Sequence, residues 1–188
     1  RITIMANFKE AYEILKRLEF NSPKNALHKN EGEEGLTWMG VYEKENPGWS
    51  GWKTIKDTLR ITRDIEQASV ILYNDAVFRA DTANFYKFKY WNKIRGEDVK
   101  SQKIASEIFI FGVNAGIGVA IKAAQKIVGV TADAVVGEKT LKALNSYDEA
   151  RFDKEFDRAE IEHYKALIEK NPKLKINANG WRNRAEAV

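Results

Sequence analysis

The chain has 188 residues, of which 44% are hydrophobic and 31% charged, and its formal net charge is +4. This composition is typical of a folded globular protein and excludes an intrinsically disordered chain. The absence of cysteine excludes a disulfide scaffold, a thiolate nucleophile and a cysteine metal site. Basic and acidic residues alternate instead of forming a basic block, so we expect no nucleic-acid partner.

The remaining whole-chain features favour a monomer that needs no metal and no other cofactor. No apolar run approaches the roughly 20 residues of a membrane helix, so we predict no membrane span. The first residues, Arg1–Met5, lack the pattern of a cleavable secretory signal, which predicts synthesis in the cytoplasm. His28 and His163 are far apart and lack the spacing of metal ligands, so both are expected to be surface or capping residues.

The periodicity of apolar residues predicts a mainly α fold with a small β-hairpin. The first helix runs from about Asn7 to Glu19, with apolar residues at three- and four-residue steps. Leu36–Tyr42 favours a short strand or hairpin, and Asp64 is an expected helix N-cap. Further helices are predicted over residues 53–59, in two pieces from 65 to 94, over 104–114, in a stretch ending at Gly129, and over 138–144 and 150–169.

Residues 104–114 are apolar on several sides and form the expected buried central helix. Gly116 and Gly118 follow this helix, whereas a nucleotide-binding loop follows a strand. We therefore interpret these glycines as sites of close helix packing. No stretch rich in proline, serine or glycine separates the two halves of the chain.

Glu19 is the leading candidate for a catalytic residue. It closes the first helix and lies between Leu18 and Phe20. The negative end of a helix dipole and an apolar surround both disfavour an ionised carboxyl group. A carboxyl that keeps its proton near neutral pH is what a glycosidase needs as general acid. The alternative is an ordinary solvated glutamate in the last turn of a helix.

Several segments resemble, in chain order, the peptidoglycan muramidases of glycoside hydrolase family 108, which include phage endolysins and proteins labelled secretion activators. In the first of these segments, Glu19 is followed by a stretch that contains Gly35, Thr37 and Gly40, where the family has a Gly-Gly pair, a threonine and a Gly-Ile. The matching segments are Leu18–Asn21 with Gly35–Val41, Tyr90–Ile94, Phe111–Gly116, Ala124–Val130 with Asp133, Gly137, Thr140 and Leu141, and Gly180–Arg184.

The resemblance implies a lysozyme-like fold and hydrolysis of the β-1,4 bond between N-acetylmuramic acid and N-acetylglucosamine. Glu19 takes the position of the general acid, and Thr37 that of a cleft residue that positions water or a second carboxylate. Bacterial peptidoglycan is the implied partner, and the periplasm or cell wall the implied place of action. The resemblance also implies a catalytic lobe over residues 1–98 and a peptidoglycan-binding part over 99–188. Because no linker separates these parts, we expect them to form one compact domain, 1–188.

The sequence departs from the family pattern around the second carboxylate. Phe20 and Asn21 replace two glycines, and the interval from Glu19 to Thr37, 18 positions, is longer than usual. Gly32 stands where the family has an aspartate. Its acidic neighbours are the expected substitutes, with Glu33 preferred over Glu31 and Glu34, and Asp64 or Asp75 as more distant alternatives.

Aromatic residues are the second clue to a glycan site, because sugar C–H faces stack on flat rings. Trp49 follows a Pro-Gly turn and is the preferred stacking residue. Trp38 and Trp52, together with Tyr42, are either further substrate contacts or core residues. Asn114 is an expected polar contact to substrate. A protein that holds peptidoglycan, or assists secretion, without cutting the polymer is the alternative function.

Overall fold

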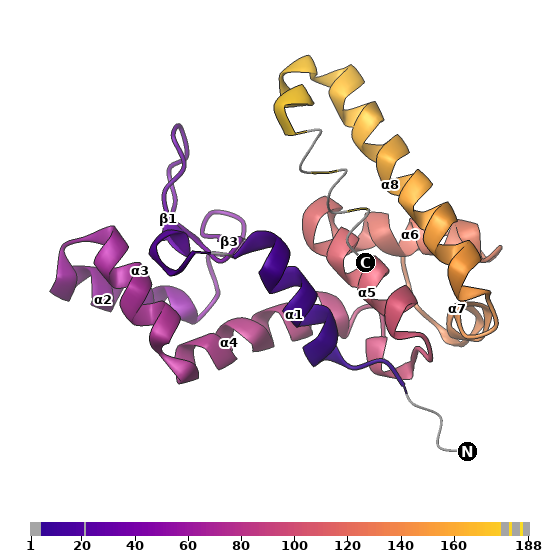
Figure 1. Cartoon of the computed structure of the whole chain (residues 1–188), viewed down its shortest axis with the longest axis horizontal. Helices are drawn as coiled ribbons and strands as arrows, with labels where there is room; N and C mark the ends of the chain where they lie inside the picture. Colours follow the sequence, from indigo (N-terminus) through magenta and orange to yellow (C-terminus); the bar gives the residue numbers. More distant parts are fainter. Residues whose placement is uncertain (1–4, 21, 178–180, 182–184, 186–188) are drawn as a thin grey trace. The chain divides into compact units, whose positions relative to one another are not determined.

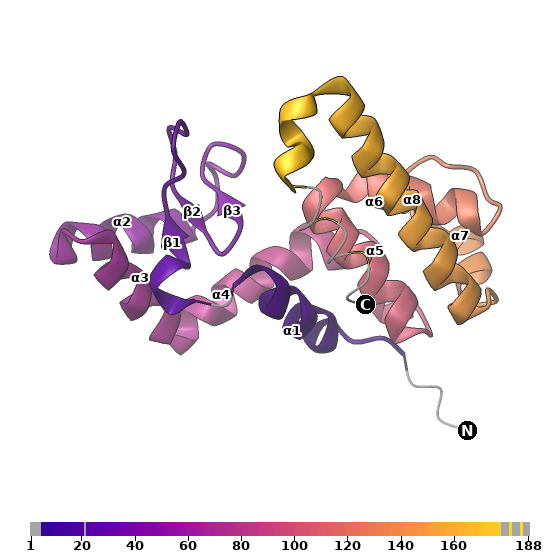
Figure 2. The same ribbon diagram turned by 45° about the horizontal axis from the view of Figure 1, so that its top comes forward.

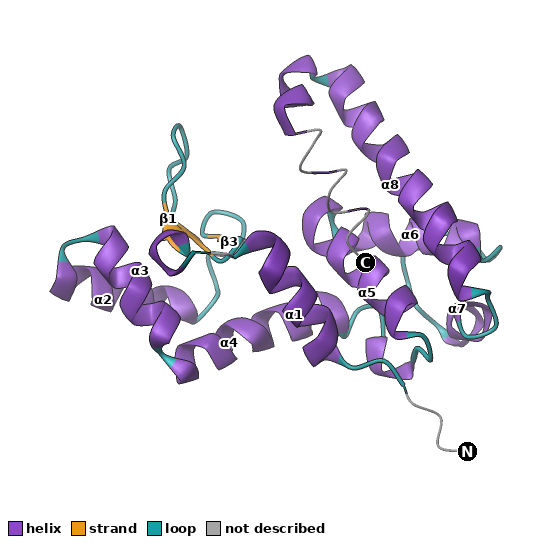
Figure 3. Cartoon of the chain, in the orientation of Figure 1, coloured by secondary structure: helices purple, strands orange, loops and turns teal. Residues whose placement is uncertain are grey.

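The computed structural model describes residues 5–20, 22–177, 181 and 185. The chain divides into two compact units, one made of Leu15–Lys87 and the other of Arg1–Ile14 with Phe88–Val188. The described residues form eight α-helices and one three-stranded sheet (Figure 3). This confirms the mainly α fold with a small β element. Within the described ranges, no helix combines the length and the apolar character that crossing a membrane requires.

The predicted helices are all present, with bounds shifted by a few residues (Figure 1). The structure adds a short strand before the hairpin and a π-helical turn, neither of which the sequence predicted. The elements are α1 (Phe8–Glu19), β1 (Leu27–His28), β2 (Thr37–Trp38), β3 (Val41–Tyr42), α2 (Gly51–Thr62), α3 (Ile65–Asn74), α4 (Ala76–Tyr86), the π turn Lys87–Trp91, α5 (Gln102–Ala115), α6 (Ile117–Ile127), α7 (Glu138–Leu144) and α8 (Glu149–Lys170).

The sheet belongs to the Leu15–Lys87 unit and has the antiparallel order β1-β2-β3 (Figure 2). Trp38 in β2 pairs with Leu27 in β1 and with Val41 in β3. Between β2 and β3, Met39 and Gly40 have φ angles of 43° and 82°. Two consecutive residues with positive φ are typical of the tight turn that matches the twist of a two-residue hairpin.

Two aspartates begin the helices α3 and α4. Asp64 Oδ1 accepts a hydrogen bond from the backbone N–H of Gln67 at 2.7 Å, which confirms its predicted capping role. Asp75 Oδ1 accepts from the backbone N–H groups of Val77 and Phe78, at 2.8 and 3.0 Å. Both carboxylates satisfy amide groups that have no partner inside the helix.

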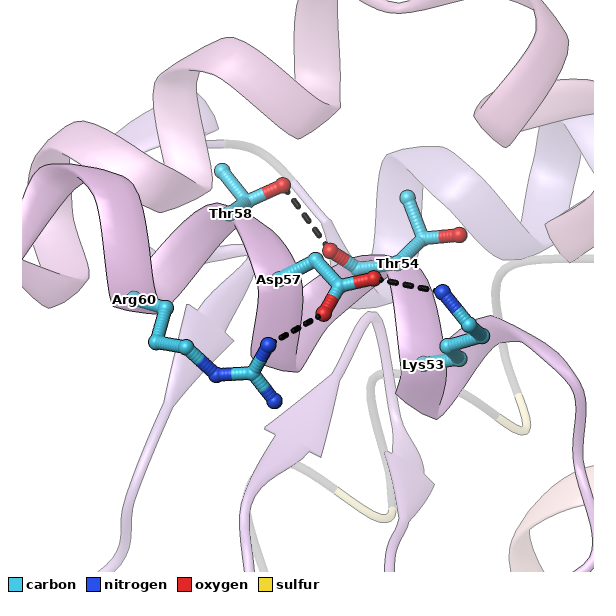
Figure 4. A network of polar contacts seen from close by, with 5 residues as sticks. All are labelled: Lys53, Thr54, Asp57, Thr58 and Arg60. Atoms are coloured by element: carbon cyan, nitrogen blue, oxygen red, sulfur yellow. Dashed lines mark hydrogen bonds and ion pairs between the residues drawn. The ribbon is translucent and has the colours of Figure 1, made fainter.

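Helix α2 carries a solvated polar cluster on its outer face (Figure 4). Asp57 forms ion pairs with Lys53 at 2.7 Å and Arg60 at 3.0 Å. The hydrogen bond from Lys53 lowers the pKa of Asp57. Exposed pairs of this kind contribute little to stability, so the buried face of α2, formed by Gly51, Trp52 and Ile55, holds the helix in place.

Helix α5 is the core of the second unit, as predicted. All residues from Ile104 to Gly112 are buried. At its side, the Phe109 ring makes edge contacts with Phe8 and Trp91, each with a centroid distance of 5.8 Å. Trp91 is fully buried in the same core. The N-terminal segment therefore belongs to the same core as a helix about a hundred positions later.

We predict that a fragment ending at Ile94 will be insoluble or unfolded, because it loses Phe109 and the rest of the core around Phe8 and Trp91. Helix α1 crosses from one unit to the other between Ile14 and Leu15. We therefore expect the full chain to unfold in one transition, seen alike by circular dichroism and tryptophan fluorescence. Two separate transitions, or a soluble, active fragment, would contradict this view.

Candidate functional site

Glu19 is the last residue of α1 and is half-exposed. The next residue, Phe20, is buried, and its ring lies 6.4 Å from the ring of Tyr86. A Cβ atom added to Gly40 would lie 3.3 Å from the Phe20 ring. The end of α1 therefore packs against the turn of the β2–β3 hairpin, which brings the two segments of the predicted catalytic motif together.

Helix α4 holds the β2–β3 hairpin through two of its side chains, Tyr86 and Thr82. The hydroxyl of Tyr86 donates to the Met39 carbonyl at 2.5 Å, and Trp38 Nε1 donates to Thr82 Oγ1 at 2.9 Å. Both donors are buried, and Trp38 has an exposed fraction of 0%. Of the two roles left open for Trp38, the structure favours the core residue, because the ring has no face open to solvent.

Thr37 lies in the central strand, paired with His28 on one side and Tyr42 on the other. Its exposed fraction is 7%, so most of the side chain is buried in the sheet. This position fixes the residue closely, and the role of Thr37 in a cleft stays a prediction.

The acidic loop between β1 and β2 holds its three glutamates in different ways. Glu33 is half-exposed and accepts a hydrogen bond from Asn30 Nδ2 at 3.0 Å. Glu34 forms an ion pair with Lys44 at 2.8 Å, and Glu31 is exposed. The more distant alternatives, Asp64 and Asp75, each use Oδ1 to cap the start of a helix.

Glu43 is a further carboxylate near this loop that the sequence did not single out. It is half-buried, it accepts the Leu36 backbone N–H at 3.2 Å, and it pairs with Lys56 at 2.7 Å. The hydrogen bond from Lys56 lowers its pKa. Glu43 therefore holds the start of β2 as an ionised residue, and only the hydrogen-bond geometry reveals this.

The other aromatic candidates divide by exposure. Trp52 has an exposed fraction of 4%, and its Nε1 donates to the Asn46 carbonyl at 2.8 Å, so the structure favours the core role of the two left open for it. Trp49 and Tyr42 are half-exposed. The Trp49 ring packs edge-on against Trp52 at 5.3 Å and occupies the space that a Cβ on Gly51 would need. Trp49 is thus held rigidly while part of its surface reaches solvent.

The predicted residues of the C-terminal half belong to the other unit. Asn114 Nδ2 donates to the Tyr164 hydroxyl at 2.5 Å, and its role as a substrate contact stays a prediction. The motif residue Gln125 donates from Nε2 to Asp133 at 2.8 Å and to Thr140 at 3.2 Å. These contacts fix the loop before α7. Of the last resembling segment, Trp181 stacks on Tyr164, while Gly180 and residues 182–184 lie outside the described residues.

This unit has a surface pocket of about 370 Å³ between α5, α6 and α8. Its lining is mostly apolar and also includes two lysines, a glutamate and a histidine. Burial lowers the pKa of His163, which favours the neutral ring. The lining residues are Phe111, Val119, Lys122, Ala123, Lys126, Ile127, Ala159, Glu162 and His163.

Comparisons with known proteins agree with the two halves of the chain. Residues 26–116 match the family described as Glycosyl hydrolase 108, and residues 119–186 match the Predicted Peptidoglycan domain. Glu19 lies before the first matched range. A solved structure, "Structure of Brucella abortus SagA", is similar to 96% of this chain and 92% of its own, with a TM-score of 0.63 and 21% identity. This likeness concerns the fold. Among curated proteins, no relative matches the chain.

We predict that Trp49→Ala will raise KM for peptidoglycan more than it lowers kcat, because a ring that binds glycan in ground and transition state alike contributes uniform binding. The measurement is a turbidity assay over a range of substrate concentrations. Ile61→Ala, which removes an 84% exposed side chain from α2, is the control and should change neither constant. Equal KM values for the Trp49 variant and the native protein would exclude Trp49 from the binding surface.

Proposed function

We propose that this protein is a glycoside hydrolase, and specifically a muramidase, because residues 26–116 match the family described as Glycosyl hydrolase 108. Its substrate is bacterial peptidoglycan, and the bond it cleaves is the β-1,4 bond between N-acetylmuramic acid and N-acetylglucosamine. The match of residues 119–186 to a peptidoglycan domain supports this polymer as the partner. The protein then acts in the periplasm or cell wall.

The observation that carries this proposal is the contact between the end of α1 and the β2–β3 turn. Glu19 precedes Phe20, and Phe20 packs against Gly40 and Tyr86. The backbone of Glu19 is therefore held beside the hairpin, as the positioning of a general acid requires. In the proposed reaction, Glu19 gives its proton to the glycosidic oxygen while the C–O bond breaks and the sugar ring develops positive charge.

The second carboxylate either attacks the sugar or activates the water that does, depending on its distance from Glu19. We propose Glu33 for this role. Asn30 holds one of its oxygens by a hydrogen bond and so limits its rotation. Glu34 is a weaker candidate because its ion pair with Lys44 draws the carboxylate to the loop exterior. Thr37 is proposed to position the water or this carboxylate from the central strand.

Substrate binding is proposed to use the exposed parts of Trp49 and Tyr42 for sugar rings, with Asn114 as a polar contact. The pocket on the other unit suits the stem peptides of peptidoglycan, since Lys122 and Lys126 offer positive charge to their carboxylates within a mostly apolar lining. This pocket is also the observation that favours the second candidate function, a protein that binds peptidoglycan without cutting it. The assay of Glu19 below decides between the two.

We predict that Glu19→Gln lowers kcat by about two orders of magnitude or more, because the amide keeps the shape but cannot donate a proton in the same way. Activity is measured as loss of turbidity of purified peptidoglycan, and mass spectrometry identifies the new reducing ends. Glu13→Gln, an exposed change on the same helix, is the matched control and should keep full activity. A folded Glu19→Gln variant with most of its activity would remove Glu19 from the mechanism. Absence of new reducing ends even with the native protein would favour the binding function.

We predict that alanine at Glu33 impairs hydrolysis far more than alanine at Glu31 or Glu34, since a nucleophile or base cannot be replaced by its neighbours without a change of geometry. Melting temperatures should stay close to native for all three, because these side chains lie on a loop. If all three variants keep native kcat, the second carboxylate comes from another segment, and Glu43 is then the next residue to replace.

A further inference from the structure

A glutamate lies in the most apolar helix of the protein. Glu107 is in the middle of α5, between Ser106 and Ile108, and has an exposed fraction of 1%. Its Oε1 atom is buried and has no hydrogen-bond partner among the described residues. Buried polar atoms in folded proteins almost always have a partner, because an unpaired one costs free energy. The side chain of Glu107 shares a hydrogen bond with Asp153, and its Oε1 atom is left with an unmet demand for a partner.

Helix α8 brings two more carboxylates to Glu107. Asp153 and Asp157 are four positions apart, so they lie on one face of the helix. One carboxylate oxygen from each of the three residues lies within 4.8 Å of the other two. Glu160, with an exposed fraction of 3%, follows on the same helix. Four acidic groups thus gather between α5 and α8.

One ion pair among the described residues brings positive charge to this cluster. Lys103 pairs with Asp153 Oδ1 at 3.1 Å and contributes one charge. Burial, together with the carboxylates of Glu160, Asp157 and Asp153, raises the pKa of Glu107 to about 10. Burial also raises the pKa of Glu160, to about 8. Three carboxylates with oxygens within 4.8 Å of one another repel each other when ionised, unless a counter-charge joins the cluster.

We propose that Glu107, Asp153 and Asp157 bind a hard divalent cation, with Ca²⁺ as the first choice. Ca²⁺ binds oxygen ligands at about 2.3–2.6 Å, so two oxygens on one ion are at most about 5 Å apart, which the three carboxylates satisfy without rearrangement. Glu107 Oε1 gains its missing partner. The ion pair of Asp153 is compatible with this role, because a carboxylate has two oxygens to offer.

The partial exposure of Asp153 and Asp157 favours Ca²⁺ over Mg²⁺. It leaves room for water molecules, which complete the six to eight ligands of Ca²⁺. Mg²⁺ demands a closer octahedral arrangement at about 2.0–2.1 Å and gives up its own water reluctantly, so it should bind more weakly. A bound cation ties α8 to α5 and so stabilises the C-terminal half of the chain.

The test uses the full-length protein after removal of metal with a chelator. Isothermal titration with CaCl₂ at pH 7.5 should show one ion per chain. The melting temperature should rise by about 5–10 °C when free Ca²⁺ is about 100-fold above Kd. Glu107→Gln and Asp157→Asn should each weaken binding at least tenfold. Glu169→Gln, an exposed change on α8, is the matched control and should bind like the native protein.

Two results would overturn the proposal. One is the absence of both heat and a melting shift with millimolar CaCl₂, MgCl₂ and MnCl₂. In that case the carboxyls share protons, and stability should rise as the pH falls from 8 to 5, because the folded protein then binds more protons than the unfolded chain. The other is native-like Ca²⁺ binding in both variants, which places the ion elsewhere. Neither measurement involves peptidoglycan, so the outcome is independent of the proposed activity.

Discussion

The candidate site depends on a hairpin whose strands are only two residues long. Such a hairpin has too few ladder hydrogen bonds to hold its shape in water alone. Helix α4 supplies what is missing, because Thr82 and Tyr86, four positions apart, hold Trp38 and the Met39 carbonyl from one face. Once the turn is fixed, Phe20 packs against it, and the end of α1 is fixed as well. The position of Glu19 thus follows from a helix that contributes no residue to the proposed chemistry.

Carboxylates of the same type serve four different purposes in this protein, and the environment alone separates them. Asp75 holds backbone N–H groups at a helix start, and Glu43 is ionised in an ion pair that supports a strand. Glu107 is surrounded by apolar residues and other acids, which favours a proton or a cation. Glu19 is half-exposed at a helix end beside a rigid turn. Position in the sequence does not reveal these differences, because burial and partners come from distant segments.

The parts that the sequence predicted correctly are those with local causes. Helix periodicity, the Asp64 cap and the apolar run of α5 each lie within a dozen or so neighbouring positions, so their signals survive without knowledge of the fold. The questions that the sequence left open have distant causes. Trp38 and Trp49 lie only 11 positions apart, and only the contact of Trp38 with Thr82, 44 positions away, shows that it is a core residue. The cluster of Glu107 with Asp153 and Asp157 could not be predicted either, because its carboxylates come from two helices and neither helix alone shows a group of acidic ligands.

The long interval between Glu19 and Thr37 does not form one long loop. Strand β1 uses part of it, and the pairing of His28 with Thr37 leaves only residues 29–36 as a loop. Ser69 of α3 anchors this strand, since its Oγ accepts the Leu27 backbone N–H at 2.9 Å and donates to the Pro23 carbonyl at 2.5 Å. Closing a loop costs entropy that grows only slowly with its length, so a few extra residues are cheap once both ends are held. The acidic residues of this loop therefore extend from two anchored ends.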